Sequence, residues 1–178
     1  MRAWLERAVI GLNLCPFAKA VHVKGLVHYR VSQARDVPQA LADLRDELLA
    51  LDAIDAGERD TTLLVLPHGF AGFLDFNDLL DPADELVASL GLEGVFQIAS
   101  FHPHYRFAGT AEDDITNFTN RAPYPTLHLL REDSIDRAVE AFPQAETIYE
   151  ANMRTLQLLG HEGWQRLDVG PAATGEGP

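Results

Sequence analysis

The segment Thr62–Pro67 reads TLLVLP and carries four consecutive apolar residues, from Leu63 to Leu66. A run without alternation is typical of a strand that is covered on both faces, because an exposed face would place a polar residue at every second position. The run ends at Pro67, and His68 and Gly69 follow it. We therefore expect this segment to be the centre of a sheet.

Three further segments are expected to join it. In Leu26–Val31 the β-prone residues alternate with His28 and Arg30, which is the pattern of a half-exposed strand. Gly94–Phe101 predicts a second buried strand, and Thr126–Arg131 predicts a fourth. The sheet therefore has four strands.

Helices are expected between and after these strands, because apolar residues recur there at a spacing of three and four. The first helix stops where Cys15 precedes Pro16, since proline disfavours the helical region for the residue before it. In the third, Asp81-Pro82 restarts or kinks the helix. The expected helical segments are Trp4 to Leu12, Leu41 to Leu51, Phe73 to Leu90, a helix from Ser134, and Pro143 to Leu159 with Gly160 at its end.

This order predicts an α/β or α+β fold, with a small mixed four-stranded sheet that is mostly parallel and covered by about five helices. Strands joined through helices are usually parallel, with right-handed crossovers. The fourth strand follows a long loop instead, so it can also be antiparallel to the third, and the strand order stays open. We expect one globular domain over residues 1–167 and a disordered tail over 168–178, where Gly, Pro, Ala and Thr leave little to bury.

The composition narrows the function. The 178 residues are 47% apolar, enough for a sizeable core, and their formal net charge is −13. This charge argues against a nucleic-acid or anionic-membrane surface, where Lys and Arg supply the affinity. No apolar run is long enough to span a bilayer and no signal peptide is recognisable, so we expect a cytoplasmic protein without nucleic-acid or membrane partners. The oligomeric state is not predicted.

Reactive side chains concentrate in Ser100–Arg131, which holds three of the seven histidines. Ligands of α/β sheets tend to bind beyond the carboxyl ends of the strands. His68 follows the second strand, and His102 and His104 follow the third. We therefore predict a ligand pocket at this edge of the sheet.

His102 and His104 are two residues apart, so in an extended chain both imidazoles project to one face. Together with Asp113 or Asp114 they would form a site for a divalent metal ion. The alternative is that the histidines bind backbone carbonyls and order the loop. The acids also have a local explanation, because Thr110 resembles a helix N-cap and carboxylates favour the first turn of a helix.

Arg121 is suited to bidentate recognition of a carboxylate or phosphate, with Asn117, Asn120 and Tyr124 beside it. The alternative is that the amides bind loop carbonyls and that Arg121 pairs with one of the surplus acids. Arg106 and Arg131 are interpreted as structural or solvent-facing.

Cys15 is the only cysteine, which excludes an intramolecular disulfide. It follows a helix C-terminus and has apolar neighbours, which favours an inert thiol, and a nucleophile paired with His102 or His128 is the alternative. His128 lies inside the fourth strand and is interpreted as a core histidine or as one that supports a ligand. The common nucleotide, serine-hydrolase, metalloprotease and dithiol motifs do not occur.

Several motifs in order resemble a bacterial family, the domain of unknown function 1415, over about Trp4 to Gly160. Ala122 stands where that family would have serine, and Phe118 where tyrosine is common, so hydroxyls there are not essential in this chain. The resemblance implies the limits of the domain and carries no reaction, ligand or catalytic residue. The motifs are Asn13-Leu14-Cys15-Pro16-Phe17-Ala18, Ala99-Ser100-Phe101-His102-Pro103, Thr119-Asn120-Arg121 with Pro123-Tyr124-Pro125, and His128-Leu129-Leu130-Arg131-Glu132.

Two hypotheses about function follow. The first is an enzyme, hydrolytic or otherwise group-transferring, that acts on a small anionic metabolite, with a histidine as general base or a divalent metal held by His102 and His104. The second is a non-catalytic module that binds a small molecule or assembles with a protein. Under the first, the catalytic candidates are Cys15, His102, His104, Asp113 and Asp114, and the ligand-binding candidates are His68, Asn117, Asn120, Arg121 and Tyr124.

Overall fold

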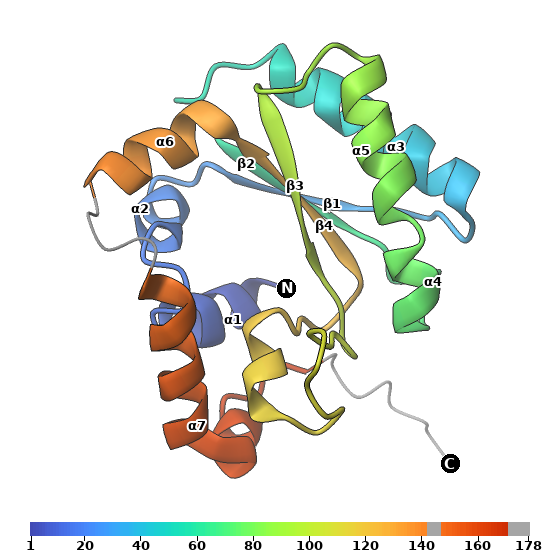
Figure 1. Cartoon of the computed structure of the whole chain (residues 1–178). Coiled ribbons are helices and arrows are strands. Elements are labelled where there is room, and N and C mark those ends of the chain that lie inside the picture. The colour runs from blue at the N-terminus through green and yellow to red at the C-terminus, as the bar shows by residue number, and fades with distance from the viewer. Residues whose placement is uncertain (142–146, 171–178) are drawn as a thin grey trace, which may run out of the picture.

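A computed structural model describes residues 1–141 and 147–170, and it contains a four-stranded mixed sheet (Figure 1). The strands are β1 (Val27–Val31), β2 (Thr61–Val65), β3 (Phe96–Phe101) and β4 (Thr126–Arg131), in the order β1-β2-β4-β3. β1 and β2 are parallel, whereas β4 lies between β2 and β3 and is antiparallel to both. The mixed α/β sheet is confirmed, and of the two directions left open for the fourth strand the structure has the antiparallel one. The expectation of a mostly parallel sheet is wrong, because β4 pairs antiparallel on both sides and only β1 and β2 are parallel neighbours.

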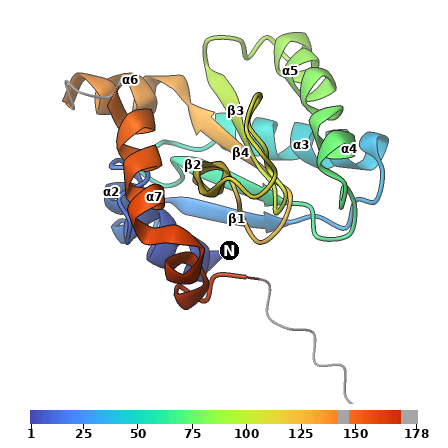
Figure 2. The ribbon, with the colours of Figure 1, turned by 60° about the horizontal axis from the view of Figure 1, so that its bottom comes forward.

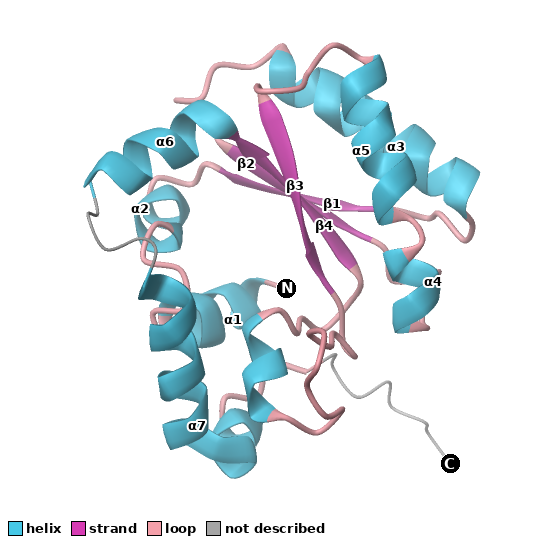
Figure 3. Cartoon of the chain, viewed as in Figure 1, coloured by secondary structure: helices cyan, strands magenta, loops and turns pink. Residues whose placement is uncertain are grey.

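The sheet lies between two groups of helices (Figure 3). α3 and α5 cover one face, and α1, α2, α6 and α7 lie on the other side (Figure 1, Figure 2). The helical elements are α1 (Arg2–Trp4), η1 (Leu5–Ile10), α2 (Ala18–Val23), α3 (Val37–Asp52), α4 (Phe73–Asn77), α5 (Leu80–Ser89), η2 (Ile115–Thr119), α6 (Glu132–Ala141) and α7 (Ile148–Arg166).

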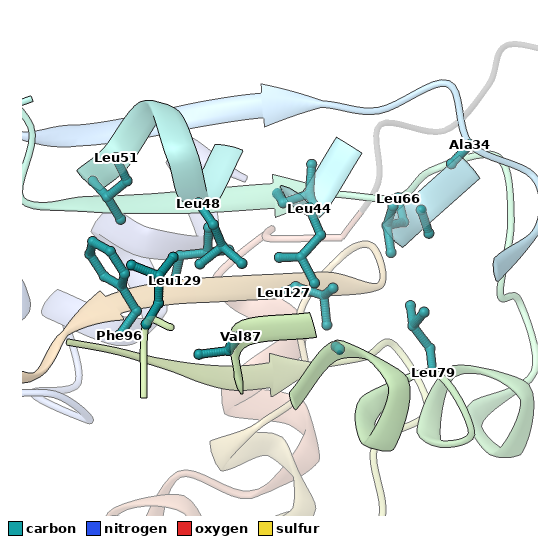
Figure 4. Close-up of a cluster of buried hydrophobic side chains, with 14 of the residues drawn as sticks. Ala34, Leu44, Leu48, Leu51, Leu66, Leu79, Val87, Phe96, Leu127 and Leu129 are labelled. Atoms are coloured by element: carbon teal, nitrogen blue, oxygen red, sulfur yellow. The ribbon is translucent and has the colours of Figure 1, made fainter. Parts of the chain in front are cut away.

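One face of the sheet is packed by a continuous apolar cluster, here called the leucine core. Leu44 and Leu48 of α3 point toward Leu127 and Leu129 of β4 (Figure 4). Each of these four side chains is fully buried. The other buried members of the leucine core are Ala34, Ala40, Leu51, Leu64, Leu66, Phe76, Leu79, Ala83, Val87, Leu92 and Phe96.

The opposite face carries a smaller cluster, the N-terminal core, whose buried members are Trp4, Leu5, Ala8, Leu63, Ala122 and Val169. Leu63 and Leu64 are neighbours on β2 and belong to different clusters, because successive side chains of a strand point to opposite faces. β2 is buried at every position, as the unbroken apolar run predicts.

Several boundaries differ from the sequence-based expectation. β3 is an edge strand and not a buried one, since β4 inserts between it and β2 and leaves Gln97 exposed. The expected helix over 73–90 is divided into α4 and α5, and the break precedes Pro82 by several residues. Gly160 is expected from the sequence to end the last helix. It has a φ of 64° and interrupts α7, but helical turns continue beyond it to Arg166.

The C-terminal expectations are only partly covered by the described residues. Val169 falls within the predicted tail, yet it is buried in the N-terminal core. Residues 171–178, and the start of the helix expected from Pro143, lie outside the described residues. Among the helices of the described ranges, none has the length and apolar character that crossing a bilayer requires.

Candidate functional site

The predicted site begins with His102, which is fully buried at the end of β3. Its Nε2 donates to the carbonyl of Phe70, in the loop that follows β2, at 2.9 Å. Its Nδ1 accepts from the backbone N–H of His104 at 3.0 Å. The ends of β2 and β3 therefore meet at one edge, as predicted, but both ring nitrogens of His102 are bound to backbone groups. Burial lowers the pKa of His102, which keeps the ring neutral.

Asn117 holds the loop between β3 and β4 together. Its side chain is fully buried, and its Oδ1 accepts from the backbone N–H of Phe107 at 3.0 Å and from the hydroxyl of Thr110 at 2.8 Å. Its Nδ2 donates to the carbonyl of Ala111 at 2.8 Å. These partners all belong to the loop itself, so Asn117 has a structural role.

Asp114 and Arg121 are also bound within the loop. Asp114, and not Thr110, caps η2, and it accepts from the backbone N–H and the hydroxyl of Thr116 at 2.9 and 2.7 Å. The hydrogen bond from that N–H lowers the pKa of Asp114. Arg121 lies over the ring of Phe118 and donates to the carbonyls of Tyr105 and Glu112. Its guanidinium is thus bound to neutral carbonyls and not to an anion.

Of the remaining predicted residues, His104 lies beside His102, with 5.8 Å between the ring centroids, and the others are dispersed. His68, His104 and Asp113 are exposed, and Asn120 donates to the carbonyl of Ser100 at 3.2 Å. Tyr124 is half-buried beside β4. Among residues 1–141 and 147–170, no group of three or more His, Cys, Asp or Glu side chains is arranged to hold a metal ion.

A cavity of about 610 Å³ lies instead on the sheet face that carries the N-terminal core. The sheet forms the floor of the cavity. The walls are formed by α1 and η1, by α2, and by α6. Of the residues predicted for the site, only Cys15 lines it. The lining residues are Trp4, Leu5, Val9, Cys15, Pro16, Phe17, Ala18, Ala20, Val21, Val27, Asp60, Thr61, Leu63, Gln97, Phe101, His128, Leu130, Arg131, Ser134, Ile135 and Ala138.

The strand alternation explains why His128 faces this cavity. Leu127 and Leu129 point into the leucine core, so His128 between them points to the other face. Its Nε2 lies 2.7 Å from Oγ1 of Thr61 on the adjacent strand β2. The hydroxyl of Thr61 donates to the carbonyl of Leu129 at 2.6 Å. Thr61 and His128 form the polar centre of a largely apolar cavity.

Burial lowers the pKa of His128 to about 4. The ring is half-buried in the cavity wall, and the surrounding protein removes part of the hydration that the charged form would have in water. His128 is therefore neutral at pH 7 and carries a single ring proton.

Two other polar side chains of the cavity, Ser134 and Arg131, already have partners, whereas the side chain of Gln97 is exposed and makes no described hydrogen bond. Ser134 donates to Asp60 at 2.6 Å. Arg131 donates to the carbonyls of Leu51, Ile54 and Arg59, which confirms that it is structural. Cys15 is half-buried and makes no hydrogen bond to His128 among the described contacts.

The model of the family described as "Protein of unknown function (DUF1415)" matches residues 1–166. The chain belongs to the DUF1415 family. No curated protein and no solved structure matches it. The family model covers every element of the fold, including both walls of the cavity and the loop between β3 and β4.

Sequence reasoning missed the cavity of this DUF1415 protein for a topological reason. Thr61 and His128 are 67 residues apart, and they meet only because β4 pairs with β2. One signal was available: a histidine between Leu127 and Leu129 in a predicted strand must face the side opposite to those leucines. That signal identifies the face of the sheet on which His128 lies, but it does not identify Thr61 as the partner of its ring.

Proposed function

We propose that this DUF1415 protein binds a small, mostly apolar molecule in the cavity between the sheet and the helices α2 and α6. The observation that carries the proposal is the cavity of about 610 Å³, whose wall is apolar except at a few points. Cavities of this size and character, with few polar groups to orient the ligand, are the usual form of small-molecule sites.

The charges in the cavity favour a neutral ligand over an anion. Among the described residues that line the cavity, Arg131 is the single cationic side chain, and its guanidinium donates to three backbone carbonyls. The carboxylate of Asp60 lines the same wall and would repel an anion. With a formal net charge of −13 the chain as a whole has the same preference.

Binding is favoured over catalysis by the state of the two reactive side chains. His128, with a pKa of about 4, is a weak base near neutral pH, and Cys15 makes no described hydrogen bond to it. A nucleophile and its base ordinarily lie within hydrogen-bond reach of each other. An enzyme built on the loop residues around His102 remains a prediction, and the binding module is the function that the geometry supports best.

The test is isothermal titration calorimetry with 4-propylphenol on three proteins. The wild type is compared with Ala138→Leu, which extends a side chain from α6 into the cavity, and with Val139→Leu, a change at the next residue of α6, which is 43% exposed and does not line the cavity. We expect saturable binding to the wild type and to Val139→Leu, and at least tenfold weaker binding to Ala138→Leu.

A second blocking variant, Ala18→Leu, narrows the cavity from the side of α2 and gives the same loss. Circular dichroism verifies that each variant is folded. Absence of binding to the wild type, or equal binding to all four proteins, would overturn the proposal.

A further inference from the structure

The polar centre of the cavity has one defined hydrogen-bonding character. The hydroxyl of Thr61 has a single proton, and the carbonyl of Leu129, 2.6 Å away, can only accept it. The contact of 2.7 Å between Oγ1 of Thr61 and Nε2 of His128 is then a hydrogen bond in which the imidazole donates. The opposite assignment would place two oxygen lone pairs against each other at 2.6 Å. The ring proton of His128 is therefore on Nε2.

This assignment leaves Nδ1 of His128 as a bare acceptor. The ring is neutral, because burial lowers its pKa to about 4, so no second proton is available at pH 7. Within the described residues Nδ1 has no hydrogen-bond partner, and His128 lines the cavity. His128 is half-buried, and Nδ1 is not among the described side-chain atoms that are both buried and without a partner, which are the hydroxyl oxygens of Tyr29 and Thr119. Nδ1 is therefore accessible, and a ligand with a donor can bind it.

From this geometry we infer that the cavity selects ligands that present a hydrogen-bond donor to Nδ1 of His128. The ligand class is apolar molecules with one hydroxyl or N–H group, such as alkylphenols, long-chain alcohols or secondary amides. The inference rests on the proposed function, since it assigns the chemistry of the ligand to the same cavity.

Ligands that carry only acceptors are disfavoured at this position. An ether oxygen or a carboxylate would place a lone pair opposite the lone pair of Nδ1. The hydroxyl of Ser134, another donor on the wall, already binds Asp60, so it does not compensate. The cavity should therefore discriminate between two ligands of similar shape that differ only in the presence of a donor.

The experiment compares 4-propylphenol with 4-propylanisole, in which a methyl group replaces the phenolic proton. Calorimetric titration of the wild type should give about tenfold tighter binding of the phenol, which corresponds to one hydrogen bond. In His128→Phe the aromatic ring is kept and the acceptor is removed. The preference for the phenol over the anisole should fall to within about twofold.

A second measurement uses only the wild type, so it does not depend on folding of the variant. The ¹⁵N resonances of His128 should show a protonated Nε2 and an unprotonated Nδ1 in the free protein. The Nδ1 resonance should move on addition of the phenol and stay in place with the anisole. A proton found on Nδ1 in the free protein overturns the inference.

The outcomes separate the two proposals. If neither compound binds, the proposed function itself fails. If both bind with equal affinity to the wild type, the cavity is a binding site without the selectivity, and only the inference fails. A preference for the phenol that persists in His128→Phe also contradicts the inference, because another group would then be the acceptor.

Discussion

His102 and His128 are two histidines inside the same fold, and burial lowers the pKa of both. His102, in the loop between β3 and β4, has both ring nitrogens bound to backbone groups. His128, on the cavity wall, has one nitrogen bound to Thr61, and no described residue binds the other. In the loop both ring nitrogens of the buried histidine bind backbone groups, although the hydroxyl of Thr119 is buried there without a described partner. On the cavity wall, Nδ1 of His128 is accessible and has no described partner, so a ligand can bind it.

The comparison shows that several of the reactive side chains in the loop bind groups of the loop itself. Asn117, Asp114 and Arg121 all satisfy backbone groups of the loop. A connection that leaves the sheet must satisfy its own backbone N–H and C=O groups, and polar side chains are the means.

The largest effect is expected from paired substitutions on β2. Leu64→Ala removes a fully buried side chain from the leucine core and should lower the free energy of unfolding by about 4 kcal/mol. Leu63→Ala removes a side chain that already borders the cavity, so fewer contacts are lost and the cost should be about 2 kcal/mol. Urea denaturation of both variants measures the difference. Equal costs would contradict an open cavity on the face of Leu63.

The next effect concerns pH. His128 has a folded pKa of about 4 and an unfolded value near 6.5, so between these values the unfolded chain binds a proton that the folded chain does not. Its contribution to stability is complete above pH 6.5 and is lost as the pH falls toward 4. The loss should be up to about 3 kcal/mol, and water in the cavity would reduce it.

The measurement is urea denaturation of the wild type and of His128→Phe at pH 7 and pH 4. The difference in stability between the two proteins should shift in favour of the variant at pH 4. The other titratable or charged groups that line the cavity, Cys15, Asp60 and Arg131, and the lowered pKa of His102, are common to both proteins and cancel in the comparison. A difference that is independent of pH would mean that His128 is not held neutral.

A smaller effect is expected in the loop. Asn117→Ala leaves the N–H of Phe107 and the carbonyl of Ala111 without their partner and should cost about 2 kcal/mol. Asn120→Ala removes a single bond to the carbonyl of Ser100 and serves as the matched control, at about 1 kcal/mol. Thermal unfolding followed by circular dichroism measures both. Neither change should alter the affinity for 4-propylphenol, because neither residue lines the cavity.

The smallest effect is expected from two exposed side chains that the sequence predicts to be part of the site. His68→Ala and Asp113→Asn should each change the free energy of unfolding by less than about 0.5 kcal/mol, since neither side chain makes a described hydrogen bond. Both variants should bind 4-propylphenol as the wild type does. A loss of binding in either variant would mean that the ligand binds at the edge of the sheet, where the sequence predicts the pocket, and not in the cavity.

Much of the fold could be predicted because the relevant signals are local. The apolar run at Thr62 identified β2, and the segment Thr126–Arg131 coincides with β4. The direction of β4 and its insertion beside β2 could not be predicted, since they depend on pairing between distant segments. The burial of β3 was overestimated for the same reason, because no local pattern reveals that it lies at the edge.

The candidate site could be predicted only in part. The meeting of the ends of β2 and β3 was correct, and it is visible in the bond from His102 to the carbonyl of Phe70. Sequence does not distinguish a side chain that is bound to nearby backbone from one that is free, so Asn117 and Arg121 were indistinguishable from ligand-binding residues. His128 was recognised as a core or supporting residue, but its contact with Thr61 requires the register of β2 and β4.

The most direct test of the account is a titration of ¹⁵N-labelled protein with 4-propylphenol, followed by the backbone amide resonances. The account predicts that the largest shifts occur at Leu63, Phe101 and His128, around the cavity, and that residues of the loop between Tyr105 and Thr119 change little. The largest shifts at His104, Asp113 and Arg121, with none around His128, would contradict it.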